Sequence, residues 1–375
     1  MKLPPIDELA RGVRAGNRAA LGRAITLVES TKPAHAVLAQ ALLRLLASPP
    51  QTAPPQTVPP QTVPPQAAQR SASGASAALV LDGATTIRVG VTGVPGVGKS
   101  TFIEGLGVAL CEAGHRVAVL AVDPSSSVHG GSILGDKTRM SVLSCHPRAY
   151  VRPSPTGGSL GGVHRRTRET IRVVEAAGYD VVLVETVGVG QSEIAVASMV
   201  DTFLVLMLAG AGDELQGIKK GILEVADLLA VNKADGDNAL PAKRARSAYA
   251  AALRLVQPTQ PEWRPRVLTC SGQSGDGVEV VWQSVLAHRR AVEATGALIQ
   301  RRRRQDLAWM WAIVESEVVG HLRRAPAVQA AAAQLEAAVQ AGQMPPTLAA
   351  WTLLDAYNHA RGQPQRDAAT PTAGG

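Results

Sequence analysis

The sequence predicts an α/β fold in which a mainly parallel central sheet is flanked by helices, with further helices before and after it. Short aliphatic runs alternate with helical segments from Thr86 onward, which is typical of strands buried on both faces of a parallel sheet. A glycine-rich turn with a lysine and a serine separates the first run from the next helix. Near the N-terminus, Leu, Ile and Val recur at three- and four-residue spacing, as in amphipathic helices.

Composition divides the chain into five parts. Residues 1–48 form an N-terminal helical segment, and 49–78 contain the repeat PPQTAPPQTVPPQTVPPQ. So much proline forbids helix and favours polyproline II, so this part is a flexible linker. Residues 79–298 form the α/β domain, 299–361 a C-terminal helical segment, and 362–375 a disordered tail.

Six aliphatic runs are the predicted strands of the sheet. In chain order they are TIRVGVT, RVAVLAVD, DVVLVET, TFLVLML, DLLAVNK and RVLTCS. Aromatic residues make up only 3% of the chain, so the core must be built from Val, Leu, Ile and Ala.

Charge and cysteine content narrow the class of protein. The chain has 375 residues, a net charge of +8 and three cysteines, Cys111, Cys145 and Cys270. The sequence contains no C-x-x-C pair, so neither a disulfide framework nor a zinc site is indicated. Aromatic and basic residues do not alternate in the pattern that is typical of nucleic-acid-binding proteins. The N-terminus lacks the apolar stretch of a secretory signal, and no stretch approaches a membrane span. We therefore expect a cytoplasmic protein that binds neither nucleic acid nor membrane.

A phosphate-binding loop is predicted between the first strand and the helix that follows it. The motif G-x-x-x-x-G-K-S runs from Gly93 to Ser100. Its glycines let N–H groups point at phosphate oxygens, and the helix N-terminus adds its positive dipole end. Lys99 is expected to reach the β- and γ-phosphates, and Ser100 to ligate Mg²⁺. The fold is therefore predicted to be a P-loop NTPase. The predicted phosphate-binding residues are Gly93, Val94, Pro95, Gly96, Val97, Gly98, Lys99, Ser100 and Thr101.

A guanine site is predicted from the segment AVNKAD. Guanine has two donors at its ring edge, N1–H and the exocyclic amine, and one carboxylate can accept from both. We expect Asp235 to bind this edge, Lys233 to cover the ring face and Asn232 to brace the loops. Backbone N–H groups near Ser271 and Gly272 are expected to meet guanine O6. The predicted ligand is GTP or GDP.

The candidate metal ligands are oxygen donors at strand ends and in a glycine-rich segment. Asp123 follows the second run, Asp136 lies in GGSILGDKTRM, and Glu185 ends the third run. Mg²⁺ binds a few hard oxygens and keeps several waters. Ser100, Asp123, Asp136 and Glu185 are therefore candidates for direct or water-mediated coordination, and the sequence leaves open which of them touch the metal.

The residues after Glu185 predict slow hydrolysis. Ras-like enzymes place a glutamine after the glycine of E/D-x-x-G, where it orients the attacking water. Here Gly188 is followed by Val189, which cannot do this. Gln191 lies two residues further on, where strand-tip geometry disfavours the same role. We expect a rate that rises when a partner supplies or positions the missing group.

Several long segments together resemble one known family. RAITLVES, GVPGVGKST, AVDPSSS, GGSILGDKTRM, RPSPTGGSLGGV, EAAGYDVVLVETVGVGQSE, GAGDELQGIKKGILEVAD and VNKADGDN are similar to segments of the MeaB/ArgK/MMAA family. The resemblance runs from about Arg14 to about Trp351 and is interrupted by the proline repeat. These P-loop GTPases escort adenosylcobalamin-dependent acyl-CoA mutases, chiefly methylmalonyl-CoA mutase.

The resemblance implies an assembly and a third switch. It implies a homodimer in which the C-terminal helices form an arm against the partner subunit. It also makes GDELQGIKKG a segment that senses nucleotide and contacts the mutase, with Gln216 and Lys219 as its active members. The expected catalytic residues are Lys99, Asp136, Glu185, Gln216 and Lys219.

The sequence departs from the family pattern at two places, and two other functions are alternatives. The proline repeat replaces a shorter connection, and Ser271-Gly272 replaces the usual Ser-Ala, which predicts a looser guanine loop with lower affinity. A nickel or cobalt metallochaperone GTPase is the first alternative, although the eight histidines are scattered and Cys145-His146 is the only adjacent Cys/His pair. A P-loop protein kinase is the second, and it requires ATP.

Overall fold

The computed structural model describes residues 4–47, 86–122, 140–153, 160–186, 192–209, 220–254 and 261–361. These residues belong to two compact units, residues 1–303 and 304–375. The proline repeat and the predicted C-terminal tail lie outside the described residues.

Seven parallel strands form one sheet within the described part of the first unit, which confirms the predicted α/β class. The strands are β1 (Ile87–Gly93), β2 (Val117–Val122), β3 (Ala149–Arg152), β4 (Val181–Thr186), β5 (Thr202–Met207), β6 (Leu228–Val231) and β7 (Arg266–Thr269). Their order across the sheet is β3-β2-β4-β1-β5-β6-β7. The carboxyl ends of β1 and β4, neighbours in the middle of the sheet, therefore lie side by side, where open α/β folds bind ligands.

Six of these strands match the predicted aliphatic runs, and β3 was not predicted. It has only four residues, AYVR, and only Ala149 among them is fully buried. The other three side chains are partly exposed because β3 is an edge strand that pairs with β2 alone. AYVR contains no continuous aliphatic run of the kind that marked the other six strands.

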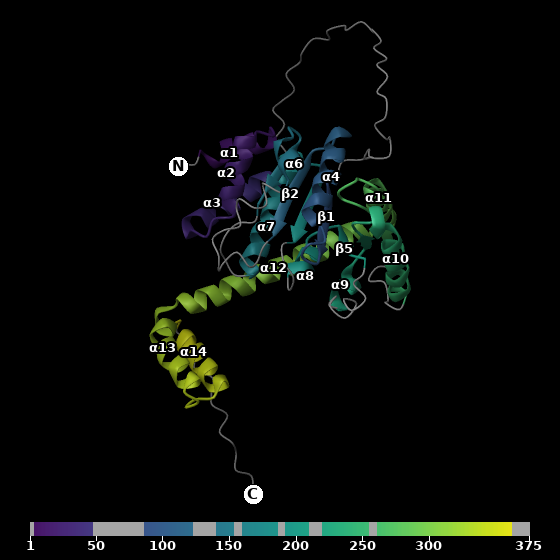
Figure 1. Cartoon of the computed structure of the whole chain (residues 1–375). Helices are drawn as coiled ribbons and strands as arrows, with labels where there is room; N and C mark the ends of the chain where they lie inside the picture. The colour runs from purple at the N-terminus through teal and green to yellow at the C-terminus, as the bar shows by residue number, and fades with distance from the viewer. Residues whose placement is uncertain are drawn as a thin grey trace, which may run out of the picture. The chain divides into compact units, whose positions relative to one another are not determined.

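Helices cover both faces of the sheet. Among the described residues of the first unit, the helices are α1 (Ile6–Arg14), α2 (Arg18–Val28), α3 (Pro33–Ala47), α4 (Lys99–Glu112), α6 (Ser141–Cys145), α7 (Leu160–Ala176), α8 (Ser192–Ala197), α9 (Lys220–Val225), the short η4 (Gly236–Asn238), α10 (Ala239–Leu253) and α11 (Val278–Ala294). Apolar residues of α4, α6 and α11 form one core with Val89 and Val91 of β1. Those of α7, α8, α9 and α10 contribute to a second core on the opposite face. Figure 1 shows α1, α2 and α3 beside α7, against which they pack.

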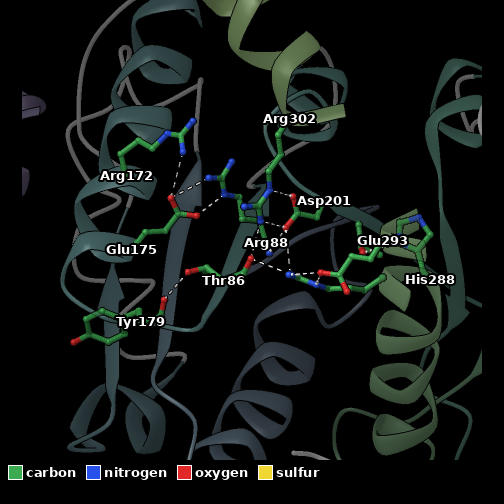
Figure 2. A network of polar contacts seen from close by, with 11 residues as sticks. Thr86, Arg88, Arg172, Glu175, Tyr179, Asp201, His288, Glu293 and Arg302 are labelled. Carbon is green, nitrogen blue, oxygen red and sulfur yellow. Dashed lines mark hydrogen bonds and ion pairs between the residues drawn. The ribbon is translucent and has the colours of Figure 1, made fainter. Parts of the chain in front are cut away.

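A polar network joins the amino ends of the strands (Figure 2). Asp201, directly before β5, accepts hydrogen bonds from the backbone N–H of Arg88 on β1 and from Nε and Nη2 of Arg302. Arg302 also donates to the carbonyl of Thr86, and the Arg88 guanidinium donates to Glu175 of α7. Burial raises the pKa of Asp201, but hydrogen bonds and charge from Arg302 outweigh it and hold that pKa below its usual range. The end of the sheet away from the predicted site is thus tied by partly buried ion pairs.

The second unit is helical. It contains the continuation of α12 (Ala297–Arg324), which begins in the first unit, together with α13 (Pro326–Gln340) and α14 (Pro346–His359). α13 and α14 pack against each other and both begin with proline at the first helical turn, where its missing N–H costs nothing. On α12, Leu307, Met310, Trp311, Val314 and Val318 are exposed and recur at helical spacing. We call these five residues the arm stripe. No helix among the described residues is long and apolar enough to cross a membrane.

Candidate functional site

The phosphate loop connects the carboxyl end of β1 to α4, as predicted. Pro95 and Gly96 are exposed at its tip, whereas Val97 is fully buried in the core beneath α4. The Lys99 ammonium donates to the carbonyls of Gly93 and Val94, at 2.8 Å and 3.3 Å. This arrangement holds the lysine over its own loop, where a phosphate bound at the N-terminus of α4 would meet it.

Asn232 joins the phosphate loop to the predicted base site. It follows β6, and its side chain is 1% exposed. Its Nδ2 donates to the Val97 carbonyl at 2.8 Å, and its Oδ1 accepts from the Gly272 N–H at 2.9 Å. Gly98 has a φ of +91°, and a Cβ there would lie 2.9 Å from Asn232 Nδ2. The structure therefore brings together two motifs that are separate in the sequence.

Lys233 and Asp235 line the edge of this arrangement. Lys233 is the only non-glycine with a positive φ among the described residues, at +58°. This conformation is uncommon for a side-chain-bearing residue and often marks functional loops. Its side chain is exposed and reaches the neighbourhood of Gly98, while Asp235 is partly exposed. The Ala234 N–H donates to the Cys270 carbonyl at 3.0 Å and fastens this segment to the next loop.

The loop after β7 packs directly on the phosphate-loop helix. A Cβ added to Gly272 would lie 2.8 Å from the backbone N of Phe102 and 2.9 Å from its Cα. Ser271 is fully buried, and its hydroxyl accepts from the Ser274 N–H within the loop. The glycine therefore allows a close approach to α4, and its N–H is held by Asn232. These contacts do not support the loosening expected from Ser-Gly.

Glu185 and Ser100 present two oxygens to a possible metal. Ser100 Oγ donates to Glu185 Oε1 at 2.9 Å, and Glu185 is 4% exposed at the carboxyl end of β4. A hydroxyl and a buried carboxylate suit Mg²⁺, which takes few protein ligands and retains waters. Among the described residues, no group of three or more His, Cys, Asp or Glu is placed to hold a metal ion. The site thus fits a Mg²⁺ held mainly by phosphate and water.

Several predicted residues lie outside the described part of the chain. They are Asp123 and Asp136 among the candidate metal ligands, Val189 and Gln191 after β4, and Gln216 and Lys219 of the proposed third switch. In the sequence, the segment between β2 and α6 contains Asp123 and Asp136. Val189 and Gln191 follow β4, and Gln216 and Lys219 follow β5.

The structure adds two features that the sequence did not predict. Thr186 Oγ1 donates to Thr92 Oγ1 at 2.8 Å, and both side chains are buried beside the phosphate loop. The Cys270 thiol donates to Asn232 Oδ1 at 3.6 Å, and burial raises the pKa of this thiol to about 12. The signal available in the sequence was a polar residue ending five of the six aliphatic runs, all except TFLVLML. Nothing in the runs paired one of these residues with another.

Comparison with protein families identifies the chain. A family model described as "Methylmalonyl Co-A mutase-associated GTPase MeaB" matches residues 63–327. The chain belongs to this family. The expected MeaB/ArgK/MMAA membership is thereby confirmed, and the nucleotide site lies within the matched range.

Relatives of this MeaB-family chain cover nearly its whole length. A protein of Mycobacterium tuberculosis named "Probable GTPase" is 50% identical over 353 residues, which are 94% of this chain and 95% of that protein. The mouse protein named "Methylmalonic aciduria type A homolog, mitochondrial" is 45% identical, over 94% of this chain and 79% of its own length. A solved structure, that of a protein named "LAO/AO transport system kinase", is 37% identical with a TM-score of 0.68, covering 94% of this chain and 98% of that one. The chain is thus a GTPase of the MeaB family.

Proposed function

We propose that this chain binds GTP with Mg²⁺, hydrolyses GTP to GDP and phosphate, and uses this cycle to gate adenosylcobalamin loading and protection of an acyl-CoA mutase, with methylmalonyl-CoA mutase as the leading candidate. The observation that carries the proposal is the bridge through Asn232, which joins the phosphate loop and the guanine motif into one site. The family description, which names association with methylmalonyl-CoA mutase, supports the choice of partner.

In this proposal the loop 93–101 cradles the phosphates and Lys99 neutralises their charge. Asp235 accepts from the guanine edge, and Lys233 covers the ring. Backbone N–H groups near Ser271 and Gly272 meet guanine O6, while the N–H groups of these two residues themselves donate to the Asp276 carbonyl and to Asn232 Oδ1. These roles rest on motif position and on the contacts of Asn232 and Ala234 that bring the segments together.

Ser100 and Glu185 would hold Mg²⁺, directly or through water, and Asp123 and Asp136 are the other candidate ligands. When bound, Mg²⁺ neutralises charge on the β- and γ-phosphates. The buried Glu185 carboxylate within hydrogen-bond distance of Ser100 is the observation that supports this.

The intrinsic rate should be low because Val189 stands where a water-orienting glutamine would. Gln216 and Lys219 are the proposed residues that the mutase reorders to complete the site. Supplying a new charged group is worth about 10³- to 10⁵-fold in well-studied switches. Reordering residues already present should give less, about 10- to 100-fold, or roughly 1.4 to 2.7 kcal/mol of barrier.

We also propose a cytoplasmic homodimer whose arms contact the partner subunit. The arm stripe supports this, because exposed apolar residues at helical spacing are typical of a helix that packs on another protein. All three cysteines are free, as expected in a reducing compartment.

The proposal is tested by phosphate release from GTP with and without a purified adenosylcobalamin-dependent mutase of the host. We expect slow release alone, stimulation of about 10- to 100-fold by the mutase, and loss of stimulation in Lys219→Ala with GTP binding intact. Lys220→Ala, the next lysine in the chain, is the matched control. Fast release by the chain alone, or no response to any such mutase, would contradict the gating function.

One relative of known structure carries the name of a kinase. A competition assay separates that activity from the one proposed for this chain, since a kinase requires ATP. We expect excess GTP, and not excess ATP, to displace a labelled guanine nucleotide, because a carboxylate at Asp235 finds no pair of donors on adenine.

A further inference from the structure

The carboxyl ends of β1 and β4 separate at one point, and a side-chain hydrogen bond joins them there. The backbone pairing of β1 with β4 ends at Val91 and Glu185. The next residue on β1, Thr92, pairs with Val205 of β5, and the next residue on β4, Thr186, pairs with Val122 of β2. The sequence continues from β1 into the phosphate loop and from β4 into residues 187–191, which lie outside the described residues.

Thr92 and Thr186 bridge this gap with their hydroxyls. Thr186 Oγ1 donates to Thr92 Oγ1 at 2.8 Å, and the two side chains are at most 1% exposed. Breaking this hydrogen bond would leave a buried hydroxyl without a partner, which costs free energy. It is the contact that continues the β1–β4 pairing one residue beyond its last backbone pair.

The residue before each threonine faces the opposite side of the sheet, because side chains alternate along a strand. On β4 that residue is Glu185, whose carboxylate accepts from Ser100 Oγ at 2.9 Å on the α4 side. The threonine pair lies on the side of the second core: a Cβ on Gly90, two residues before Thr92, would touch Val196 of α8. The hydrogen bond between the hydroxyls therefore fixes the strand ends on the side of the second core, while Glu185 projects toward α4.

We propose that Thr186 and Thr92 are positioning residues for Glu185. Their hydrogen bond holds the end of β4 against the end of β1, and so keeps the Glu185 carboxylate within reach of Ser100 and of the Mg²⁺ that accompanies the nucleotide. This inference rests on the proposed nucleotide and Mg²⁺ site, and assigns to two buried side chains a role in its metal affinity. Neither side chain touches the nucleotide.

The decisive variant is Thr186→Val, which keeps the side-chain shape and removes the hydroxyl. The measurement is the Mg²⁺ concentration that half-saturates binding of a fluorescent, non-hydrolysable GTP analogue, together with the midpoint of urea unfolding. We expect the required Mg²⁺ concentration to rise about 5- to 10-fold, within the range that the loss of one buried hydrogen-bond partner allows. Thr186→Ser, which keeps the hydroxyl, should stay close to the wild type.

Thr202→Val is the matched control. The Thr202 hydroxyl is also buried in this sheet and forms a hydrogen bond of 2.8 Å, to His288 Nδ1, but at the amino end of β5. We expect this variant to lower the unfolding midpoint and to leave the Mg²⁺ requirement unchanged. If Thr186→Val behaves in the same way, the threonine pair is only part of the core and the inference is wrong.

The double variant Thr92→Val/Thr186→Val separates stability from position. Replacing both partners by apolar groups of the same shape can be nearly neutral for stability. We expect the unfolding midpoint to recover toward the wild type while the raised Mg²⁺ requirement persists; recovery of both would overturn the inference. If binding to the wild-type chain shows no dependence on Mg²⁺, the proposed metal site itself fails, and the inference with it.

Discussion

At the scale of the residue, the candidate site depends on two glycines, whose lack of a side chain allows close packing. Gly272 lies against the backbone of Phe102, and Gly98 lies against the Asn232 amide. Asn232 contacts both segments and joins the loop after β7 to the phosphate loop. The glycine at position 272 thus permits the close approach of this loop to α4.

Gly272→Ala tests this packing. The added Cβ would meet backbone atoms that cannot rotate away, so the loop must shift from α4 and carry its N–H away from Asn232. Overpacking of this kind costs about 1–3 kcal/mol. We expect GTP affinity, measured by calorimetry, to fall about 5-fold or more. Gly22→Ala on α2, where an added Cβ would meet nothing within 4 Å, is the control. Unchanged affinity in Gly272→Ala would show that the close approach is not needed.

At the scale of the element, the helix α12 is attached to the sheet by two consecutive arginines. Arg302 binds Asp201 before β5, and Arg301 donates to Asp227 before β6 at 3.1 Å (Figure 2 shows the first pair). Asp227 also accepts from the backbone N–H of Phe203 at 2.8 Å. These contacts hold the amino ends of strands whose carboxyl ends lead to the nucleotide loops.

Arg302→Ala should therefore destabilise the first unit without affecting the nucleotide site directly. It leaves the Asp201 carboxylate, 2% exposed in its ion pair, without its main charged partner. Breaking a buried pair in this way costs roughly 3–5 kcal/mol, and Arg302 is partly exposed, so we expect about 2–3 kcal/mol. Urea unfolding measures the loss, and GTP affinity should change less than about 2-fold. The neighbouring Arg303→Ala, exposed on the same helix, is the control; equal effects of the two variants would contradict this role of Arg302.

At the scale of the whole molecule, the arm stripe on α12 is the surface that the proposed dimer would cover. Its side chains recur at positions 307, 310, 311, 314 and 318, so that they share one helix face. Trp311 is the largest of them and is 56% exposed. A monomer would leave this apolar face in water.

Val314→Glu should turn the dimer into a monomer. A charge in the middle of an apolar interface must be desolvated without a partner, which association cannot recover. We expect light scattering to report a dimer for the wild type at micromolar concentration and a monomer for the variant. Ser316→Glu, on the opposite face of the same helix, should remain a dimer. A monomeric wild type would refute the proposed assembly and leave the nucleotide site unaffected.

The sequence by itself determined the fold class and the place of the phosphate loop between a strand and a helix, whereas the guanine-binding roles remain predictions. Each of these is carried by contiguous residues: the six aliphatic runs form strands, and Gly93, Gly96 and Gly98 give the loop its positive φ angles. Family membership followed from the same contiguous segments and was confirmed by the match over 63–327. The third switch, the metal set and the dimer remain predictions.

Only the tertiary structure decided which of these local pieces meet. Thr92 and Thr186 are 94 residues apart in the chain, and Asn232 is 135 residues from the Val97 carbonyl that it binds. No periodicity pairs such residues, because the partner of a buried polar group is set by strand order and register. The edge strand β3 belongs here too: its four residues, mostly half-exposed, form a strand because β2 offers them a backbone ladder. Local motifs could be predicted from the sequence because they depend on neighbours in the chain. The positions of side chains relative to one another depend on neighbours in space.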